Sequence, residues 1–251
     1  MESGAIDEAA RLLARARLSR KPLAELPAHC RPHTIAEGHA VQDALVARLG
    51  EPVAGWKVAG IRPGEVMRGA VLASRLYEAP ARIQASDMPL LGVEAEIAFR
   101  FDRPLAPRDR DYERQEIVDV VTALPAFEVV DTRFASYSET PVLHRLGDCM
   151  SNGALICGPL RPDWRDFDLA TLEIVLTVDG EVVHRSTGGH SNGDPLLPAI
   201  ALANELRAGP GISAGQIVTT GTYSGLRFVS AGSHLVASFE GFGQVEVTFE
   251  R

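Results

Sequence analysis

The stretch from Val93 to Phe101 constrains the fold most, because its residues alternate strictly between two classes. Successive side chains of a β-strand point to opposite faces of the sheet, so this period of two predicts a strand with one buried face. The buried face would carry Val93, Ala95, Ile97, Phe99 and Phe101. The opposite face would carry Glu94, Glu96, Ala98 and Arg100.

The second half of the chain is also rich in predicted strands. Asp179-Gly180 separates two β-branched runs, 172–178 and 181–185, which predicts a hairpin closed by a type I′ turn. Three more strands are expected at 216–222, 234–240 and 244–250, and a short one at 126–131.

Helices are predicted mainly at the N-terminus. Residues 5–18 carry apolar side chains at helical spacing, and a second helix is expected between a capping box at Thr34 and Glu37 and a terminal Gly50. Two further helices are expected at 111–124 and 193–207. Pro195 is acceptable in the first turn of the latter. We therefore expect an α+β fold with a helical portion over 1–53 and a mixed β core over 54–251, which could form one continuous domain.

Composition excludes several classes of protein. The chain has 251 residues and a net charge of −8, with no cluster of Lys and Arg, which argues against nucleic acid or an anionic membrane as partner. No apolar run reaches the roughly 18 residues that span a bilayer, and the N-terminus lacks the features of a secretory signal. The three cysteines form no CxxC pair, so we expect a cytoplasmic protein without disulfides.

Three carboxylates form the most informative candidate site. Glu94 and Glu96 would share one strand face about 6–7 Å apart at the backbone, and Glu128 lies in the apolar run 126–131. Like charges this close repel unless a cation lies between them, and Mg²⁺ prefers such oxygen ligands. The alternatives are a solvated face for the first pair and an Arg or Lys partner for Glu128.

Lys57 is a second candidate, because it lies in a short apolar stretch, Gly55 to Gly60. Burial lowers a lysine pKa and neighbouring carboxylates raise it, while a bound cation cancels much of that rise. Lys57 could therefore titrate nearer to neutral pH and act as an acid or base. The alternative is a lysine that extends to the surface.

Two polar segments are weaker candidates. Gly188 to Gly193 precedes a helix and could bind an anion, or it could be a mobile loop. Thr219 to Gly225 is rich in hydroxyl groups and could bind a carboxylate, or it could be a simple turn.

Taken together, these segments resemble one known family. Gly55-Trp56-Lys57-Val58, Val93 to Phe99 and Ala126 to Arg133 are similar in order and spacing to the 2-keto-4-pentenoate hydratase and 4-oxalocrotonate decarboxylase group. That group belongs to the fumarylacetoacetase-like superfamily. The likeness continues through Gly193-Asp194-Pro195 and Val218 to Thr222 as far as Val247, so it covers nearly the whole chain.

The resemblance implies a mixed β-roll-like core and a Mg²⁺ or Mn²⁺ ion held by Glu94, Glu96 and Glu128. It implies Lys57 as the active-site lysine and 2-hydroxydienoates or 2-oxo acids from aromatic ring breakdown as substrates. We also expect substrate contacts from Asp131, Arg133, Asn152, Thr220, Gly221 and Thr222. A homo-oligomer is expected, and association with another enzyme of the same pathway is compatible with the family.

Three positions depart from the family's pattern. Ser74 stands in a stretch that usually carries an acidic residue, Ser151-Asn152 replaces an Asp-Asn pair, and Asp194 replaces the histidine of a Gly-His-Pro motif. These differences concern groups that move protons or orient substrate, while the metal ligands are intact.

The resulting functional prediction is a hydratase-type lyase that converts a 2-hydroxy-2,4-dienoate into a 4-hydroxy-2-oxo acid. Decarboxylation of a vinylogous 2-oxo diacid ranks second, and C–C hydrolysis of an acylpyruvate ranks third. A catalytically inactive binding or scaffold partner with the same fold is the alternative from a different class.

Overall fold

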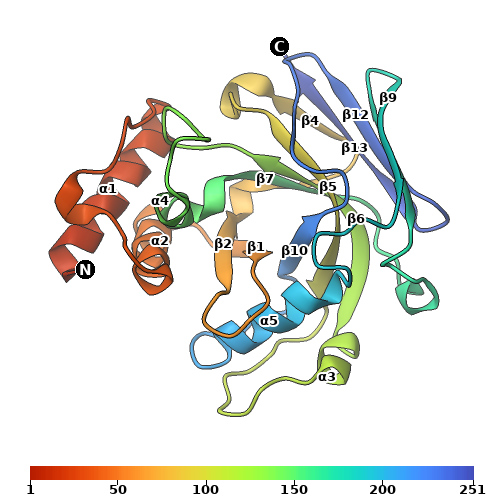
Figure 1. The fold of residues 1–251 in the computed structure, drawn as a ribbon, viewed down its shortest axis with the longest axis horizontal. Coiled ribbons are helices and arrows are strands. Elements are labelled where there is room, and N and C mark those ends of the chain that lie inside the picture. The colour runs from red at the N-terminus through yellow and green to blue at the C-terminus, as the bar shows by residue number, and fades with distance from the viewer.

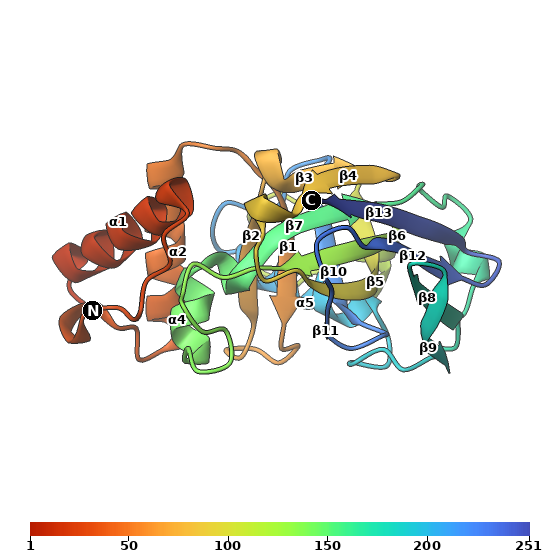
Figure 2. The ribbon, with the colours of Figure 1, turned by 90° about the horizontal axis from the view of Figure 1, so that it is seen from above.

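The computed structural model describes residues 1–251 and has three parts side by side (Figure 1). Helices α1 (Ser3–Ser19), α2 (Ile35–Leu49) and α4 (Val142–Gly147) lie at one end. A curled sheet occupies the middle and a second sheet the other end, as the view from above also shows (Figure 2). The expected mixed fold with a β core and an N-terminal helical portion is confirmed.

The central sheet contains eight strands, and it carries the candidate site. Along the sheet the order is β2 (Met67–Leu72), β1 (Val53–Ala59), β10 (Ile217–Thr222), β5 (Gly92–Phe101), β6 (Val121–Val130), β7 (Asn152–Cys157) and β3 (Leu76–Glu78). The short β11 (Arg227–Phe228) pairs with one end of β5. The β1–β10 and β3–β7 pairs are parallel, and the other pairs are antiparallel.

The second sheet has five strands, in the order β4 (Ala81–Gln84), β13 (Gly243–Glu250), β12 (His234–Phe239), β8 (Glu173–Val178) and β9 (Glu181–Thr187). The predicted β8–β9 hairpin is confirmed. Its turn residues Asp179 and Gly180 both have positive φ, at 52° and 86°, as a type I′ turn requires.

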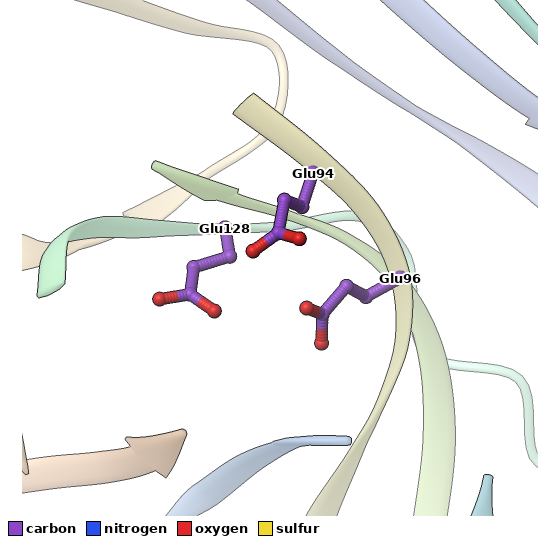
Figure 3. Close-up of side chains that lie close together, drawn as sticks. All are labelled: Glu94, Glu96 and Glu128. Atoms are coloured by element: carbon purple, nitrogen blue, oxygen red, sulfur yellow. The ribbon is translucent and has the colours of Figure 1, made fainter. Parts of the chain in front are cut away.

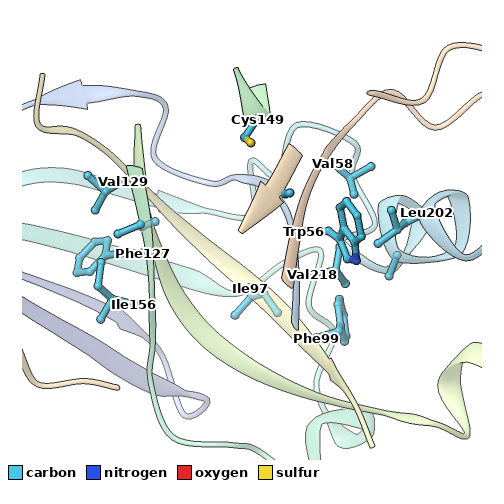
Figure 4. Close-up of a cluster of buried hydrophobic side chains, with 14 of the residues drawn as sticks. Trp56, Val58, Ile97, Phe99, Phe127, Val129, Cys149, Ile156, Leu202 and Val218 are labelled. Carbon is cyan, nitrogen blue, oxygen red and sulfur yellow. The ribbon is translucent and has the colours of Figure 1, made fainter. Parts of the chain in front are cut away.

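Strand β5 is present as predicted, but both of its faces are enclosed. Its outer face packs in a core of 54 residues, where α5 (Leu196–Leu206) contributes Leu202 beside Trp56 and Val218 (Figure 4). The inner face belongs to a separate apolar cluster: Val71, Ala98, Leu124, Ala126, Leu155, Cys157 and Ile217. Because the central sheet is curled, the face that alternation marks as polar becomes the wall of an interior.

The N-terminal helices attach to the free edge of β2 through buried side chains of α2. Gln42 is fully buried, and its Nε2 donates to the carbonyl of Arg68 at 2.7 Å. Its Oε1 accepts from the amide of Ala70, also at 2.7 Å. These bonds satisfy the edge of β2 as a neighbouring strand would. Helix α2 begins and ends as predicted, with Thr34 accepting from the Glu37 amide and Gly50 in the left-handed region.

The predicted helix over 111–124 is wrong for most of its length. Helix α3 covers only Arg114–Val118, and β6 begins at Val121. The apolar spacing of 117–124 fits a helix, but β-branched Val120, Val121 and Thr122 fit a strand better. Pairing along the whole length of β5 decides the outcome.

The remaining elements are single turns: η1 (Ala28–Cys30), η2 (Ala73–Arg75), η3 (Ala85–Asp87), η4 (Cys149–Ser151) and η5 (Trp164–Asp166). None of the helices has both the length and the apolar character that crossing a membrane requires.

Candidate active site

Three glutamates converge on the inner face of the central sheet. Glu94 on β5 is the direct partner of Glu128 on β6, and Glu96 lies two residues further along β5 on the same face. One oxygen of each carboxylate lies within 4.8 Å of the other two, and the side chains point toward one another (Figure 3). Alternation on one strand and register with the next therefore assemble the cluster.

Burial makes this cluster unfavourable as three free anions. The side chains of Glu96 and Glu128 are only 1% and 2% exposed. Burial, then the charge of Glu128, raises the pKa of Glu94 to about 7. Burial and the charges of Glu128 and Glu94 raise the pKa of Glu96 well above its usual range. Three inward-facing carboxylate oxygens are the donor set of a hard divalent cation, which would relieve this repulsion.

Backbone amides of β10 hold Glu96 in place. The amides of Thr220 and Gly221 both donate to its Oε2 at 2.9 Å. A register shift between Thr219 and Thr222 turns these amides inward, and Gly221 adopts a φ of 115° that favours glycine. Because both bonds go to Oε2, the Oε1 atom remains available to a cation.

Lys57 on β1 completes the charged cluster. Its Nζ lies 2.5 Å from Oε1 of Glu128, and its side chain is 12% exposed. Burial opposes the ammonium charge, but Glu128 and Glu94 outweigh burial and raise the pKa of Lys57. Without a cation, the carboxylates therefore favour the charged amine, and the expectation that a bound cation brings the pKa of Lys57 nearer to neutral pH stays a prediction.

Two uncharged groups lie beside these residues. Thr219 is the direct partner of Lys57 across the parallel β1–β10 pair, and its buried hydroxyl has no hydrogen-bond partner. On β7, Asn152 donates from Nδ2 to Oε1 of Glu128 at 3.5 Å. Thr219 is the first residue of the hydroxyl-rich segment that the sequence offered as a candidate carboxylate-binding site, although no individual role was expected for it.

Asp131 and Arg133 lie away from the carboxylate cluster. Asp131 follows β6 three residues after Glu128, so alternation turns it to the other side of the sheet, where it accepts from the Leu90 amide at 3.2 Å. Buried Arg133 donates from Nε to Oδ1 of Asp148 at 2.5 Å. Nothing in the sequence alone indicated Asp148 as that partner.

The other expected substrate contact, Thr222, is the direct partner of Glu96 across the β10–β5 pair. Its Oγ1 accepts from the amide of Ser224 at 3.1 Å. The structure therefore brings Lys57, Asn152 and the segment from Thr220 to Thr222 to the carboxylates. The substrate-binding roles expected for these residues, as for Asp131 and Arg133, stay predictions.

The three departures from the family pattern occupy different environments. Ser74 is exposed on η2. Asp194 accepts from the Leu196 amide at 2.9 Å and pairs with Arg114, so it holds the start of α5. The Ser151 hydroxyl is buried without a hydrogen-bond partner.

A left-handed turn supports Lys57 from one side. Cys149, Met150 and Ser151 have φ values of 50°, 52° and 58°, a conformation that costs energy in residues other than glycine. The turn packs on Gly69 of β2. A Cβ at Gly69 would lie 2.5 Å from the Cys149 carbonyl oxygen and 2.7 Å from Cγ of Lys57. The missing side chain of Gly69 therefore makes room for both.

The family model for the fumarylacetoacetate (FAA) hydrolase C-terminal domain matches residues 69–250, which include all three glutamates. The chain belongs to the fumarylacetoacetate hydrolase family. The resemblance found in the sequence is thereby confirmed, and the match runs from within β2 to the end of β13.

Members of this family are similar in sequence to this chain over its whole length or over most of it. A 2-keto-4-pentenoate hydratase of Paraburkholderia phymatum is 30% identical, over 97% of each chain. A 4-oxalocrotonate decarboxylase of Pseudomonas putida is 31% identical, over 62% of this chain and 59% of its own. The solved 4-oxalocrotonate decarboxylase of Pseudomonas putida G7, complexed with magnesium and adipate, is 22% identical. It superposes with a TM-score of 0.86 over 99% of this chain and 98% of its own, which shows the shared fold.

Proposed function

We propose that this protein is a divalent-cation-dependent lyase that hydrates a small 2-hydroxy-2,4-dienoate to a 4-hydroxy-2-oxo acid. The observation that carries the proposal is the buried set of three carboxylates with a lysine 2.5 Å from one of them. Full-length similarity to a 2-keto-4-pentenoate hydratase supports hydration over other reactions of the family. Substrates of this class arise when aromatic rings are broken down.

The carboxylates of Glu94, Glu96 and Glu128 would hold the cation, which we propose to be Mg²⁺ or Mn²⁺. When bound, it supplies Lewis-acid polarisation of the substrate's 2-oxo oxygen. The amides of Thr220 and Gly221 fix Glu96 before any ligand arrives, so this carboxylate needs no reorganisation on binding.

Lys57 is the group that we propose to act on the substrate. Its amine lies beside Glu128, and as an ammonium it would attract the substrate carboxylate or donate a proton. The unpartnered hydroxyl of Thr219 beside it offers a further hydrogen bond to an oxygen of the substrate. Apolar residues of the inner face, such as Ala98 and Leu155, would seat the hydrocarbon part of the substrate and exclude water.

The proposed reaction requires two proton movements and one addition. The enol hydroxyl of the dienoate loses its proton while the terminal carbon gains one, which gives a 2-oxo acid with one remaining double bond. Water then adds its oxygen to the fourth carbon and a proton to the third. An ammonium close to the chain's acidic groups can donate and recover such protons.

Decarboxylation of a vinylogous 2-oxo diacid is the second candidate, favoured by the similarity to the Pseudomonas putida decarboxylase. C–C hydrolysis has less support, since it calls for a histidine–glutamate pair facing the carboxylates. His190 packs near Gly221 with its Nε2 buried and unpartnered, but no hydrogen bond pairs its ring with a glutamate, and its Nδ1 accepts from the Asn192 amide. Loss of catalysis in a scaffold protein is motivated only by Ser74, Ser151 and Asp194, and the first lies exposed while the last holds α5.

An assay on two substrates tests the proposal. Purified protein is supplied with Mg²⁺ or Mn²⁺ and 2-hydroxypenta-2,4-dienoate, and the ultraviolet absorbance of the diene is followed while mass spectrometry identifies the product. We expect cation-dependent loss of absorbance and a product one water heavier than the substrate. Release of CO₂ from 4-oxalocrotonate without hydration would favour the decarboxylase instead. If neither substrate is turned over, both the proposed hydratase activity and the decarboxylase alternative are contradicted.

A further inference from the structure

A cavity of about 280 Å³ lies apart from the carboxylate cluster, between the end of α1, the segment 86–90 and the segment 131–137. None of the three glutamates and no part of Lys57 lines it. Asp131 and Arg133, for which substrate contacts were expected, line this cavity. Its charged lining consists of four arginines and two aspartates: Arg17, Arg20, Arg75, Arg133, Asp87 and Asp131.

The two aspartates of the cavity are already paired. Asp87 lies 2.5 Å from Arg20, and Asp131 lies 3.6 Å from Arg133. Arg133 is further neutralised by Asp148, which accepts from its Nε. With Asp148 counted, four arginines face three aspartates, which leaves one excess positive charge, and Arg17 and Arg75 have no aspartate partner of their own.

Arg17 is the most informative group of the cavity. Its Nε and Nη2 are buried and have no hydrogen-bond partner. Burial, then the charges of Arg133 and Arg75, lowers the pKa of Arg17 to about 10, so the guanidinium is still charged at neutral pH. A buried guanidinium without an acceptor is costly, and a bound anion would supply the missing acceptor.

We propose that this cavity is a second ligand site that binds a small dianion. Arg17 of α1 and Arg75 of η2 would hold the anion. Two guanidinium groups with free N–H donors match two negative charges, because guanidinium geometry favours carboxylate and phosphate oxygens. Inorganic phosphate and a short dicarboxylate share this chemistry, and both fit a volume of about 280 Å³. Ser86 and Tyr137 line the same space, and their hydroxyl groups are neutral hydrogen-bond donors.

Isothermal titration calorimetry tests the site on the whole protein in metal-free buffer at constant ionic strength. Phosphate and succinate are titrated separately, and acetate serves as the monoanion control. We expect one dianion per chain to bind and acetate to bind at least tenfold more weakly. Tighter binding of phosphate would indicate that the cavity selects phosphate groups, and tighter binding of succinate that it selects dicarboxylates.

Variants decide which residues receive the anion. Arg17→Met and Arg75→Met should each weaken dianion binding at least tenfold, whereas Arg15→Met, at an exposed position of the same helix, should leave it unchanged. Lys57→Met should also leave it unchanged, which separates this site from the carboxylate cluster. Without anion, Arg17→Met should melt no lower than wild type, because it removes an unpaired buried charge. That result excludes misfolding as the reason for lost binding.

Two results would overturn the proposal. One is the absence of binding by either dianion below about 10 mM, a range in which weak small-anion sites are still measurable. The other is unchanged binding in Arg17→Met together with a lower melting temperature. The arginine would then be a structural residue of the junction between α1 and the β core.

Discussion

Glu96 presents one carboxylate oxygen to two backbone amides and leaves the other free for a cation. Glu96→Gln keeps the shape of the side chain and removes its charge. We expect Mg²⁺ affinity, measured by calorimetry, to fall at least about tenfold, the lower end of what loss of even an outer-shell partner costs. Glu65→Gln, at an exposed position, is the control. Unchanged affinity in Glu96→Gln would show that the cluster is not a cation site.

Lys57 is one of only two lysines in a chain with many arginines, and the other, Lys21, is exposed. Arginine keeps its proton at any physiological pH, so a lysine suits a position that must donate one. Lys57→Met should lower kcat by about 10²–10⁴, the usual cost of losing one proton-transfer or charge-stabilising group. Lys21→Met should change nothing.

Metal binding should survive in Lys57→Met, because the three carboxylates remain. Calorimetry with Mg²⁺ on the same preparation checks this point. A kcat/KM within about threefold of wild type would instead make Lys57 a structural partner of Glu128.

Glu94 predicts how stability depends on pH in metal-free buffer. Its pKa rises from 4.5 to about 7 on folding, so between these values the folded state binds a proton that the unfolded state has lost. Raising the pH through this window removes that proton and lowers the free energy of unfolding by up to about 3 kcal/mol. Urea unfolding at pH 5 and pH 8 should show the loss in wild type and a smaller loss in Glu94→Gln.

Saturating Mg²⁺ should also reduce the loss of stability, because the cation favours the charged carboxylates. An identical pH dependence for wild type, Glu94→Gln and the Mg²⁺-bound protein would contradict the assignment of this effect to the cluster.

At the residue scale, the sequence predicted that the three glutamates lie together, but it predicted only some of the residues that surround them. Period-two spacing places Glu94 and Glu96 on one face whatever the fold, and the register of β6 then adds Glu128. Asp131 and Arg133 lie within a few residues of Glu128, yet they lie on the other side of the sheet. Thr219 and Asp148 reach their positions through strand pairing and a loop, which local sequence patterns do not encode.

At the scale of elements, Gly69 of β2 permits the close approach of η4 to Lys57. Gly69→Ala would place a methyl group 2.5 Å from a carbonyl oxygen and 2.7 Å from the lysine side chain. We expect a loss of about 1–3 kcal/mol in the free energy of unfolding, typical of overpacking, together with reduced activity. Urea unfolding and the diene assay measure the two effects. Gly4→Ala, which meets no atom within 4 Å, is the control.

If the residues around Gly69 could move aside at no cost, Gly69→Ala would match Gly4→Ala in both the free energy of unfolding and the activity. That outcome would remove the left-handed turn from the description of what positions Lys57.

Elements with strong local signals were predictable, and those defined by pairing were not. Helix α2 carries its own cap residues and the β8–β9 turn its own Asp-Gly pair, so both follow from the sequence. The helix expected over 111–124 failed because its apolar spacing also suits the start of β6. Strands β1, β2 and β7 were not predicted, since glycines and short lengths interrupt their patterns and neighbouring strands stabilise them.

At the scale of the whole molecule, one apolar core of 54 residues runs from α1 and α2 to the five-stranded sheet. The carboxylate cluster lies on the inner face of the curled sheet, while the arginine-lined cavity lies toward the helices, on the other side of β6. Arg133 lies between them, since its Nη1 donates to the carbonyl of Asn152, whose side chain reaches Glu128.

Strand β9 ends the five-stranded sheet with an unpaired edge, and its Val182 and Val183 are 54% and 38% exposed. Open strand edges with apolar side chains favour pairing with another chain, so we predict a homo-oligomer that uses this edge. Light scattering at micromolar concentration should give a mass well above 27.0 kDa. Val182→Lys with Val183→Lys should lower that mass, whereas Leu18→Lys on α1, also highly exposed, should not. A wild-type mass of 27.0 kDa would refute the oligomer, and an oligomer insensitive to the valine substitutions would refute the role of β9.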